Sequence, residues 1–346
     1  MSFAEISFED SLKKSVVNTG KCVGCGACVV VCPFKCLEYV DGKPVLMKEC
    51  KVCGICARVC PQYEWSWSEA ENFVFGRKRR AEEDFGVYRR LVLARAKNTK
   101  TLRVGQDGGV VTALLLFALK KGIIDSAAVS GKNKEKPFYP IPRMSTLPEE
   151  ILECAGTKYF YSPNMFAVAE GAKRKKACMA FIGTPCQIRA IRKMQIAGLK
   201  KCTASIKFLV GLLCSECFNY EGLMEKHIHG KLGINLGDII KMNIKGKILV
   251  TTKSGVTTVP LADVRRYARK SCRFCDDFSA ELADISVGGL GLDGWTFVIV
   301  RTEAGEKLLE EAGKAGVLQT KPVEKDDSAL NLLVKLSRKK RVPVSE

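Results

Sequence analysis

Two cysteine runs of identical spacing lie within the first 60 residues of this 346-residue chain. Each run reads Cys-x2-Cys-x2-Cys-x3-Cys-Pro, and the runs begin at Cys22 and Cys50. In such a run the first three thiolates bind one 4Fe-4S cluster, and the fourth reaches a second cluster nearby. The spacing therefore predicts two adjacent 4Fe-4S clusters, one bound by Cys22, Cys25, Cys28 and Cys60, and the other by Cys32, Cys50, Cys53 and Cys56.

Zinc binding and disulfide bonding are the alternative uses of such cysteines. Zinc sites usually take two separated cysteine pairs with longer gaps. The chain has 17 cysteines and shows no secretory signal peptide, which favours a reducing cytoplasm and metal ligation over disulfides. No apolar run approaches the roughly 18 residues of a membrane span. We therefore expect a cytoplasmic protein that carries electrons one at a time.

The formal net charge is +19, because lysine and arginine outnumber aspartate and glutamate by 56 to 37. Bound thiolates and sulfides offset part of this charge, and basic patches attract an acidic ligand or partner. Short basic clusters at residues 77–80, 173–176 and 338–341 are each typical of a solvated surface. A basic, iron–sulfur-bearing nucleic-acid-binding protein is an alternative, which steep salt dependence of DNA binding would support, but the chain contains no recognition motif.

The chain divides into three predicted parts. Residues 1–70 form a bacterial-type dicluster ferredoxin domain, residues 71–325 a larger α/β domain, and residues 326–346 a basic tail. Apolar strand and helix patterns alternate from residue 90 onward, which indicates an α/β core. Two turn signals between the β-branched runs of residues 239–260 predict a small antiparallel insertion. The two histidines, His227 and His229, lie on a predicted polar helix and are expected at the surface.

Further cysteines occur at the ends of predicted elements in the second domain. Cys186 follows one apolar strand, and Cys214 with Cys217 follows the next. Cys272 and Cys275 form a third group. Four of these five thiols can bind a third 4Fe-4S cluster, with zinc as the alternative. The remaining thiols lack partners in the sequence and are expected to be buried: Cys36, Cys154, Cys178 and Cys202.

Two turns in the second domain have the form of ligand-binding loops. Residues 104–110 are rich in glycine and precede an apolar helix, so the backbone can approach an anionic ligand. Residues 181–187 pass from a strand into a helix through Gly183, Thr184 and Pro185. Neither turn is a dinucleotide fingerprint or a Walker A loop, and a plain tight turn explains residues 104–110 equally well.

Taken in order, six segments resemble the family of coenzyme F420-reducing hydrogenase beta subunits, which also includes parts of F420-dependent dehydrogenases. The resemblance covers roughly residues 20–305, and the matching segments are residues 106–112, 156–163, 183–187, 211–214, 272–278 and 283–288. With its N-terminal ferredoxin unit, the chain is most similar to the electron-input component of the membrane-bound F420 dehydrogenase complexes.

The resemblance implies FAD, a third 4Fe-4S cluster and coenzyme F420 as the substrate. It makes Cys186, Cys214, Cys272 and Cys275 the ligands of the third cluster, with Cys217 as a spare thiol or a substitute ligand. Lys158 is the candidate electrostatic partner of the flavin or the coenzyme. The implied cofactor-binding residues are Gln106, Asp107, Gly108, Gly109, Val110, Thr112, Lys158, Tyr159, Ser162, Asn164, Gly183, Thr184, Pro185, Gly288, Gly289 and Trp295.

The expected function follows from the electron count. Reduced coenzyme F420 donates a hydride, whereas iron–sulfur clusters take single electrons. A flavin can accept the hydride and release its two electrons one at a time. The resemblance therefore implies that the chain oxidises the coenzyme and delivers electrons to a quinone or methanophenazine reductase complex at the cytoplasmic face of the membrane. Alternatives are a beta subunit of an F420-reducing hydrogenase or formate dehydrogenase, a soluble F420:ferredoxin oxidoreductase, and an electron-transfer adaptor without catalytic activity.

Overall fold

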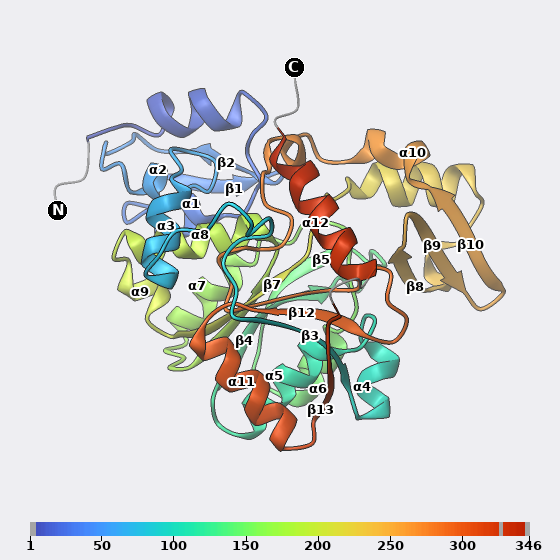
Figure 1. The fold of residues 1–346 in the computed structure, drawn as a ribbon. Coiled ribbons are helices and arrows are strands. Elements are labelled where there is room, and N and C mark those ends of the chain that lie inside the picture. Colours follow the sequence, from blue (N-terminus) through green and yellow to red (C-terminus); the bar gives the residue numbers. More distant parts are fainter. Residues whose placement is uncertain (1–4, 325–327, 343–346) are drawn as a thin grey trace.

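A mixed eight-stranded sheet forms the centre of the larger domain in the computed structural model, which describes residues 5–324 and 328–342 (Figure 1). Five strands run parallel, and β13, β12 and β5 run antiparallel to their neighbours. In spatial order the strands are β13 (Leu318–Pro322), β3 (Arg90–Ala96), β12 (Thr296–Val300), β11 (Ile285–Gly288), β7 (Ile206–Leu212), β6 (Met179–Gly183), β4 (Ser126–Lys132) and β5 (Pro140–Ser145).

Helices cover both faces of this sheet, so the domain has three layers (Figure 1). On one face, α5 (Val110–Lys120), α6 (Pro148–Glu153) and α11 (Glu303–Lys314) bury their apolar side chains. On the other face lie α7 (Met165–Lys173), α8 (Pro185–Ile196) and α9 (Lys200–Thr203). The predicted α/β fold is therefore confirmed. The loops at the carboxyl ends of the five parallel strands gather at one edge of the sheet.

The N-terminal unit has the expected ferredoxin-like arrangement. A hairpin and two short helices follow the π-helix η1 (Glu9–Val17), in the order α1 (Ala27–Val31), β1 (Leu37–Val40), β2 (Lys43–Leu46) and α2 (Ile55–Val59). Helix α1 packs on α7 so closely that a Cβ atom at Gly26 would lie 2.8 Å from the ring of Phe166. Helix α2 packs on α8. The cysteine runs therefore lie directly against the large domain.

The segment between the ferredoxin unit and the large domain contains helix α3 (Trp67–Phe75). Contacts of this segment hold the two units together. The Arg189 guanidinium of α8 lies 4.6 Å from the ring centre of Trp65 and 4.7 Å from that of Trp67. Trp67 donates a hydrogen bond of 2.8 Å from Nε1 to Asp276, which also pairs with Arg189. Lys193 of α8 donates to the backbone carbonyl of Glu64 at 3.0 Å. These contacts fix the ferredoxin unit against helix α8.

The predicted antiparallel insertion is a separate three-stranded sheet. Its strands are β8 (Ile239–Ile244), β9 (Lys247–Thr252) and β10 (Gly255–Pro260). It packs with the π-helix η2 (Glu221–Lys231) around a core of its own. The short helices α10 (Leu261–Val264), η4 (Arg265–Tyr267) and η5 (Lys270–Phe274) then lead the chain back to the large domain.

The surface position predicted for His227 is wrong. Its side chain is only 1% exposed, whereas His229 is exposed as expected. His227 lies four residues after Leu223 and next to Ile228, so it shares the apolar face of η2 that packs into the core of the insertion. The polar residues of the opposite face concealed this orientation in the sequence.

The expected basic tail contains a helix, α12 (Ser328–Arg341), within the part of the chain that the structure describes. Ala329 and Leu333 are fully buried against Phe85 and Phe297. Arg338 forms two hydrogen bonds of 2.8 Å with the carboxylate of Asp84. The apolar positions recur every four residues and form a narrow stripe, which the many lysines and arginines obscure in the sequence. In the described ranges, no helix has both the length and the apolar content needed to cross a bilayer.

Candidate electron-transfer and cofactor site

The structure brings Cys22, Cys25, Cys28 and Cys60 together as the first thiol group. Burial, followed by the neighbouring Cys60 and Cys22, raises the pKa of Cys25 well above its ordinary value. Cys28 shows the same effect from burial and then from Cys25, Cys60 and Cys22. Three of these thiols are buried and Cys22 is partly buried. Without a cation nearby they would be costly as thiolates, so their grouping fits a metal cluster whose positive charge offsets them.

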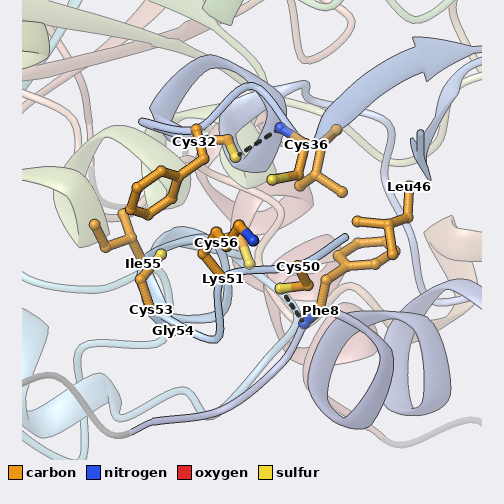
Figure 2. A pocket seen from close by; sticks show the side chains of 12 residues that line it. Phe8, Cys32, Cys36, Leu46, Cys50, Lys51, Cys53, Gly54, Ile55 and Cys56 are labelled. Carbon is orange, nitrogen blue, oxygen red and sulfur yellow. Dashed lines mark hydrogen bonds between the residues drawn. The ribbon is translucent and has the colours of Figure 1, made fainter. Parts of the chain in front are cut away.

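A second thiol group, Cys32, Cys50, Cys53 and Cys56, lines a cavity of the ferredoxin unit (Figure 2). The backbone N–H of Cys36 donates to the sulfur of Cys32 at 3.3 Å, and that of Phe8 donates to the sulfur of Cys50 at 3.4 Å. Such N–H···S bonds stabilise a thiolate that binds a metal. Burial, followed by Cys50, Cys53 and Cys32, raises the pKa of Cys56 to about 12. The residues present therefore fit a second cluster.

The two short helices explain why the fourth cysteine of each run joins the thiol group of the other run. Cys32 directly follows α1, and Cys60 directly follows α2, each in an extended conformation. Because α1 and α2 pack together, each helix carries its last thiol towards the group formed by the other run. The structure thus brings the eight thiols into two groups of four, and cluster binding by these groups stays a prediction.

A third thiol group forms at the carboxyl edge of the large sheet. Strands β6 and β7 are parallel neighbours, with Gly183 opposite Gly211, so the cysteines that follow them, Cys186 and Cys214, meet at this edge. The sulfur of Cys272 accepts a hydrogen bond of 3.3 Å from the backbone N–H of Cys217. The third group therefore contains five thiols: Cys186, Cys214, Cys217, Cys272 and Cys275.

Electrostatics agrees with this grouping. The hydrogen bond with Cys217 and then burial raise the pKa of Cys214 well above its ordinary value. Burial, followed by Cys214, raises the pKa of Cys272 to about 11. Burial also raises the pKa of Cys275, while Lys340 acts in the opposite direction. In the part of the chain that the structure describes, no three His, Cys, Asp or Glu side chains are arranged to hold a single metal ion.

The third group faces the first group rather than the second. Cys25 and Cys186 lie close enough for each thiolate to disfavour the other. The Tyr161 hydroxyl lies 3.8 Å from the sulfur of Cys186, and burial, followed by Cys186 and Cys25, raises the pKa of Tyr161. The three groups therefore form a series in which the first lies between the third and the second.

The glycine-rich loop at residues 105–109 is held between three elements. The backbone N–H of Gly108 donates to the Thr296 hydroxyl at 3.1 Å, next to β12. Gln106 accepts a hydrogen bond of 3.4 Å from the backbone N–H of Thr157 and pairs with Asn243 of β8. Gly109 begins α5 with a φ of 67°, a left-handed conformation that suits glycine. Val110 and Thr112 follow as buried residues of α5.

A second predicted segment, Gly288–Gly289, contacts this loop directly. A Cβ atom at Gly289 would collide with the Asp107 carboxylate, so a larger residue there would have to displace the Asp107 side chain. Burial raises the pKa of Asp107, and the cations Lys245 and Lys241 act against that rise. Trp295 lies further along the same loop, with Lys321 4.7 Å and Arg95 5.5 Å from its ring centre.

The Gly-Thr-Pro turn and residues 162–164 form one hydrogen-bonded unit. The Gln187 side chain accepts from the backbone N–H of Thr184 at 3.0 Å and donates to the carbonyl of Ser162 at 2.5 Å. Asn164 donates to the carbonyl of Ile182 at 3.0 Å and accepts from the Ser162 hydroxyl at 2.7 Å. Ser162 and Asn164 are buried, and their hydrogen bonds position the turn from within the protein. Pro185 occupies the first turn of α8.

Lys158 and Tyr159 lie at the same edge of the sheet. The Lys158 ammonium donates to the carbonyl of Ser130 at 2.9 Å and to that of Cys154. Burial lowers its pKa to about 8. The Tyr159 hydroxyl accepts a hydrogen bond of 3.0 Å from the backbone N–H of Ile244 in β8. The predicted cofactor residues thus come from segments that share the carboxyl edge, the edge at which α/β sheets bind ligands.

Several residues near the site escaped sequence reasoning. Lys241 donates to the carbonyl of Gly105 at 3.2 Å, so the antiparallel insertion supplies basic side chains beside the glycine-rich loop. Arg269 and Lys340 lie beside the third thiol group. Folding of a distant segment brings Lys340 there, and Arg269, three residues before Cys272, belongs to none of the matching motifs.

Comparison with known proteins is consistent with the geometry. Residues 91–169 match the N-terminal part, and residues 177–326 the C-terminal part, of the family described as coenzyme F420 hydrogenase/dehydrogenase, beta subunit. Residues 15–38 match a 4Fe-4S binding domain. The coenzyme F420 hydrogenase subunit beta of Methanothermobacter thermautotrophicus is 40% identical over 261 residues, which cover 74% of this chain and 92% of that protein.

The chain belongs to the family of coenzyme F420 hydrogenase/dehydrogenase beta subunits. Another relative, the F subunit of the F(420)H(2) dehydrogenase of Methanosarcina mazei, is 32% identical over 304 residues, covering 85% of this chain and 83% of that protein. A chain in the solved F420-reducing NiFe hydrogenase complex from Methanosarcina barkeri shares 34% identity, with a TM-score of 0.72 and coverage of 77% and 92%. The resemblance that the motifs predicted is therefore confirmed, as is a beta-subunit α/β domain preceded by a 4Fe-4S ferredoxin-like unit.

Proposed function

We propose that this chain oxidises reduced coenzyme F420 and passes the electrons singly to a partner complex. The observation that carries the proposal is the series of three thiol groups, which leads from the carboxyl edge of the large sheet into the ferredoxin unit. Iron–sulfur clusters bound by these thiols would supply one-electron transfer. The protein's own contribution is to position the cofactors and the coenzyme.

FAD, when bound, would supply the conversion of a two-electron hydride into two single electrons. The loops that support such binding are residues 105–109, residues 183–185 and residues 288–289, which the fold gathers at one edge. Lys158 is our candidate for an electrostatic contact, because it is partly buried without a carboxylate among its described partners. Lys241 and Lys245 lie beside the first of these loops and suit the phosphate and glutamate groups of a deazaflavin coenzyme.

The second thiol group is the proposed exit. Its cavity is also lined by Phe34, which is 52% exposed, and nearby in the sequence Met47 is 55% exposed. An exposed apolar surface beside a redox group suits contact with another protein chain. We propose a membrane-bound quinone or methanophenazine reductase complex as the acceptor, which would place the chain at the cytoplasmic face of the membrane through its partners.

Other acceptors define the alternative functions. A beta subunit of an F420-reducing hydrogenase or of a formate dehydrogenase would use the same site with a different partner. The F(420)H(2) dehydrogenase relative covers 85% of this chain at 32% identity, and the hydrogenase relative covers 74% at 40% identity, so the comparisons are compatible with both types of partner. A soluble F420:ferredoxin oxidoreductase would deliver electrons to a small carrier instead.

The test is cofactor analysis of anaerobically purified protein, followed by rapid mixing with a reductant. Three cubanes and one flavin predict about twelve irons and one FAD per chain. Reduced coenzyme F420 should bleach the flavin absorbance, and NADH should not. About eight irons, no flavin and no response to the coenzyme would instead indicate an electron-transfer adaptor and would refute the proposal.

A further inference from the structure

Arg269 lies between the ferredoxin unit and the third thiol group. It lies between the short helices η4 and η5, three residues before Cys272. Its backbone belongs to the third group, because the Arg269 N–H donates to the carbonyl of Cys217 at 2.9 Å and the Arg269 carbonyl accepts from the N–H of Cys272 at 3.0 Å. Any movement of this arginine therefore moves two loops that carry third-group thiols.

The guanidinium reaches out of that group to the first cysteine run. Its Nη1 donates to the backbone carbonyl of Val23 at 2.9 Å, between Cys22 and Cys25. A Cβ atom at Gly24 would lie 3.1 Å from Nη2, so a larger residue there would crowd the guanidinium. One side chain thus joins a cluster-binding loop of the ferredoxin unit to the cysteine loops of the large domain.

The same guanidinium stacks on Tyr161, with 4.5 Å between its carbon and the ring centre. The hydroxyl of Tyr161 in turn lies 3.8 Å from the sulfur of Cys186. Stacking on an aromatic face fixes the plane of an arginine and is favourable for its charge. Arg269 is therefore held in one orientation between the first and third thiol groups.

The charge of Arg269 is matched by sulfur rather than by carboxylate. Its described contacts are with the Val23 carbonyl, with Tyr161 and with cysteines, and they include no ion pair with an aspartate or glutamate. A partly buried cation without a carboxylate is stable only beside another source of negative charge, which thiolate-bound clusters on both sides would provide.

We infer that Arg269 is a positioning residue that couples the first and third thiol groups and raises the reduction potentials of the clusters they bind. The inference rests on the proposed function, since it needs a cluster at both groups. A fixed positive charge stabilises the more negative, reduced state of each cluster. When one electron passes, the third-group cluster is oxidised and the first-group cluster is reduced, while Arg269 keeps its proton and all its bonds.

The experiment compares Arg269→Gln, Arg269→Lys and Arg266→Gln in the full chain, by EPR-monitored redox titration after iron and sulfide analysis. Arg266 is a matched control, because it is an exposed arginine of the same segment that lies 4.9 Å from the ring centre of Tyr267. The cluster of the second group is an internal control, since Arg269 contacts none of its cysteines. Lysine at position 269 keeps the charge but cannot reproduce the planar contacts.

In Arg269→Gln we expect the reduction potentials of the first-group and third-group clusters to fall, and the potential of the second-group cluster to stay unchanged. Arg269→Lys should recover most of the shift, and Arg266→Gln should match the wild type. Wild-type potentials in Arg269→Gln with full iron content would overturn the inference. If Arg269→Gln loses iron, Arg269→Lys decides the outcome. Recovery of both the iron content and the reduction potentials in Arg269→Lys supports the inference. Failure of Arg269→Lys to recover the iron content or the potentials overturns the inference. A wild type with about eight irons would refute the third cluster itself and the inference with it.

Discussion

Lys340 donates a hydrogen bond of 3.1 Å to the backbone carbonyl of Cys272, although 68 positions separate the two residues. The same ammonium donates to the carbonyl of Ser215, between Cys214 and Cys217. One lysine from the last helix therefore connects two of the three segments that carry thiols of the third group. A salt bridge between Arg341 and Glu281, at 2.6 Å, holds the end of that helix in place.

We predict that Lys340→Met weakens the third cluster. Loss of a charged donor to two carbonyls should reduce the free energy of unfolding by about 1–2 kcal/mol. Release of iron to a chelator should accelerate several-fold for about four of the irons. Lys339→Met is the matched control, because Lys339 is adjacent but exposed. Equal rates of iron release in the two variants would show that Lys340 does not support the cluster.

Cys186→Ala should remove the third cluster alone. Because Cys186 belongs to the third thiol group and not to the ferredoxin runs, iron should fall from about twelve to about eight per chain. Flavin bleaching by reduced coenzyme F420 should survive, while electron delivery to a one-electron dye should be lost. Cys178→Ala, which alters a cysteine outside the three groups, should retain all the iron. Loss of every cluster in Cys186→Ala would refute the assignment.

The features that the sequence predicted correctly are those encoded by local spacing. The two cysteine runs fix which thiols share a loop, and the strand–helix alternation fixes the sheet. The antiparallel insertion followed from two turn signals and β-branched runs. Cys186 and Cys214 meet because parallel strands end at one edge, which is a general property of such sheets.

The features that the sequence concealed depend on contacts between distant segments. Arg269 and Val23 are 246 positions apart, and no local pattern predicts that they meet. Lys340 lies in a run of basic residues that is typical of a solvated surface, yet tertiary packing gives it two carbonyl partners. Ser162 and Asn164 were expected in the cofactor site, and whether they touch a cofactor stays a prediction, while their described hydrogen bonds support the neighbouring turn.

Gly109→Val should empty the proposed flavin site. A Cβ atom at Gly109 would lie 3.2 Å from the carbonyl of Thr101, and the side chain would stand in the loop where the backbone is expected to meet the ligand. The substitution also strains the backbone, because φ is +67°. Flavin content per chain is the readout, and we expect loss of most of the flavin with iron unchanged.

Gly122→Val is the control that separates the backbone strain of Gly109→Val from its effect on the glycine-rich loop. Gly122 has the same φ of +67°, but a Cβ atom there would meet no atom within 4 Å. Both variants carry a similar backbone penalty of about 1–2 kcal/mol, and only Gly109→Val alters the loop. Retention of full flavin by Gly109→Val, or equal flavin loss in both variants, would show that residues 105–109 form only a turn.

Lys158 should make stability depend on alkaline pH. Burial lowers its pKa to about 8 from an ordinary value of 10.5, so the folded protein loses this proton before the unfolded chain does. Between these values the unfolded state binds more protons, and stability therefore rises with pH. Below about pH 8 both states are protonated, and the cost of burying the charge is present in full.

Lys158→Met removes this titration. Relative to that variant, the wild type should gain stability of the order of 1–3 kcal/mol between about pH 8 and pH 10.5. Denaturant unfolding at half-unit pH steps, with flavin content matched, measures the difference. Lys173→Met, which alters an exposed lysine at the end of α7, should run parallel to the wild type. A constant difference between wild type and Lys158→Met over this interval would mean that Lys158 is hydrated and titrates as a surface lysine does.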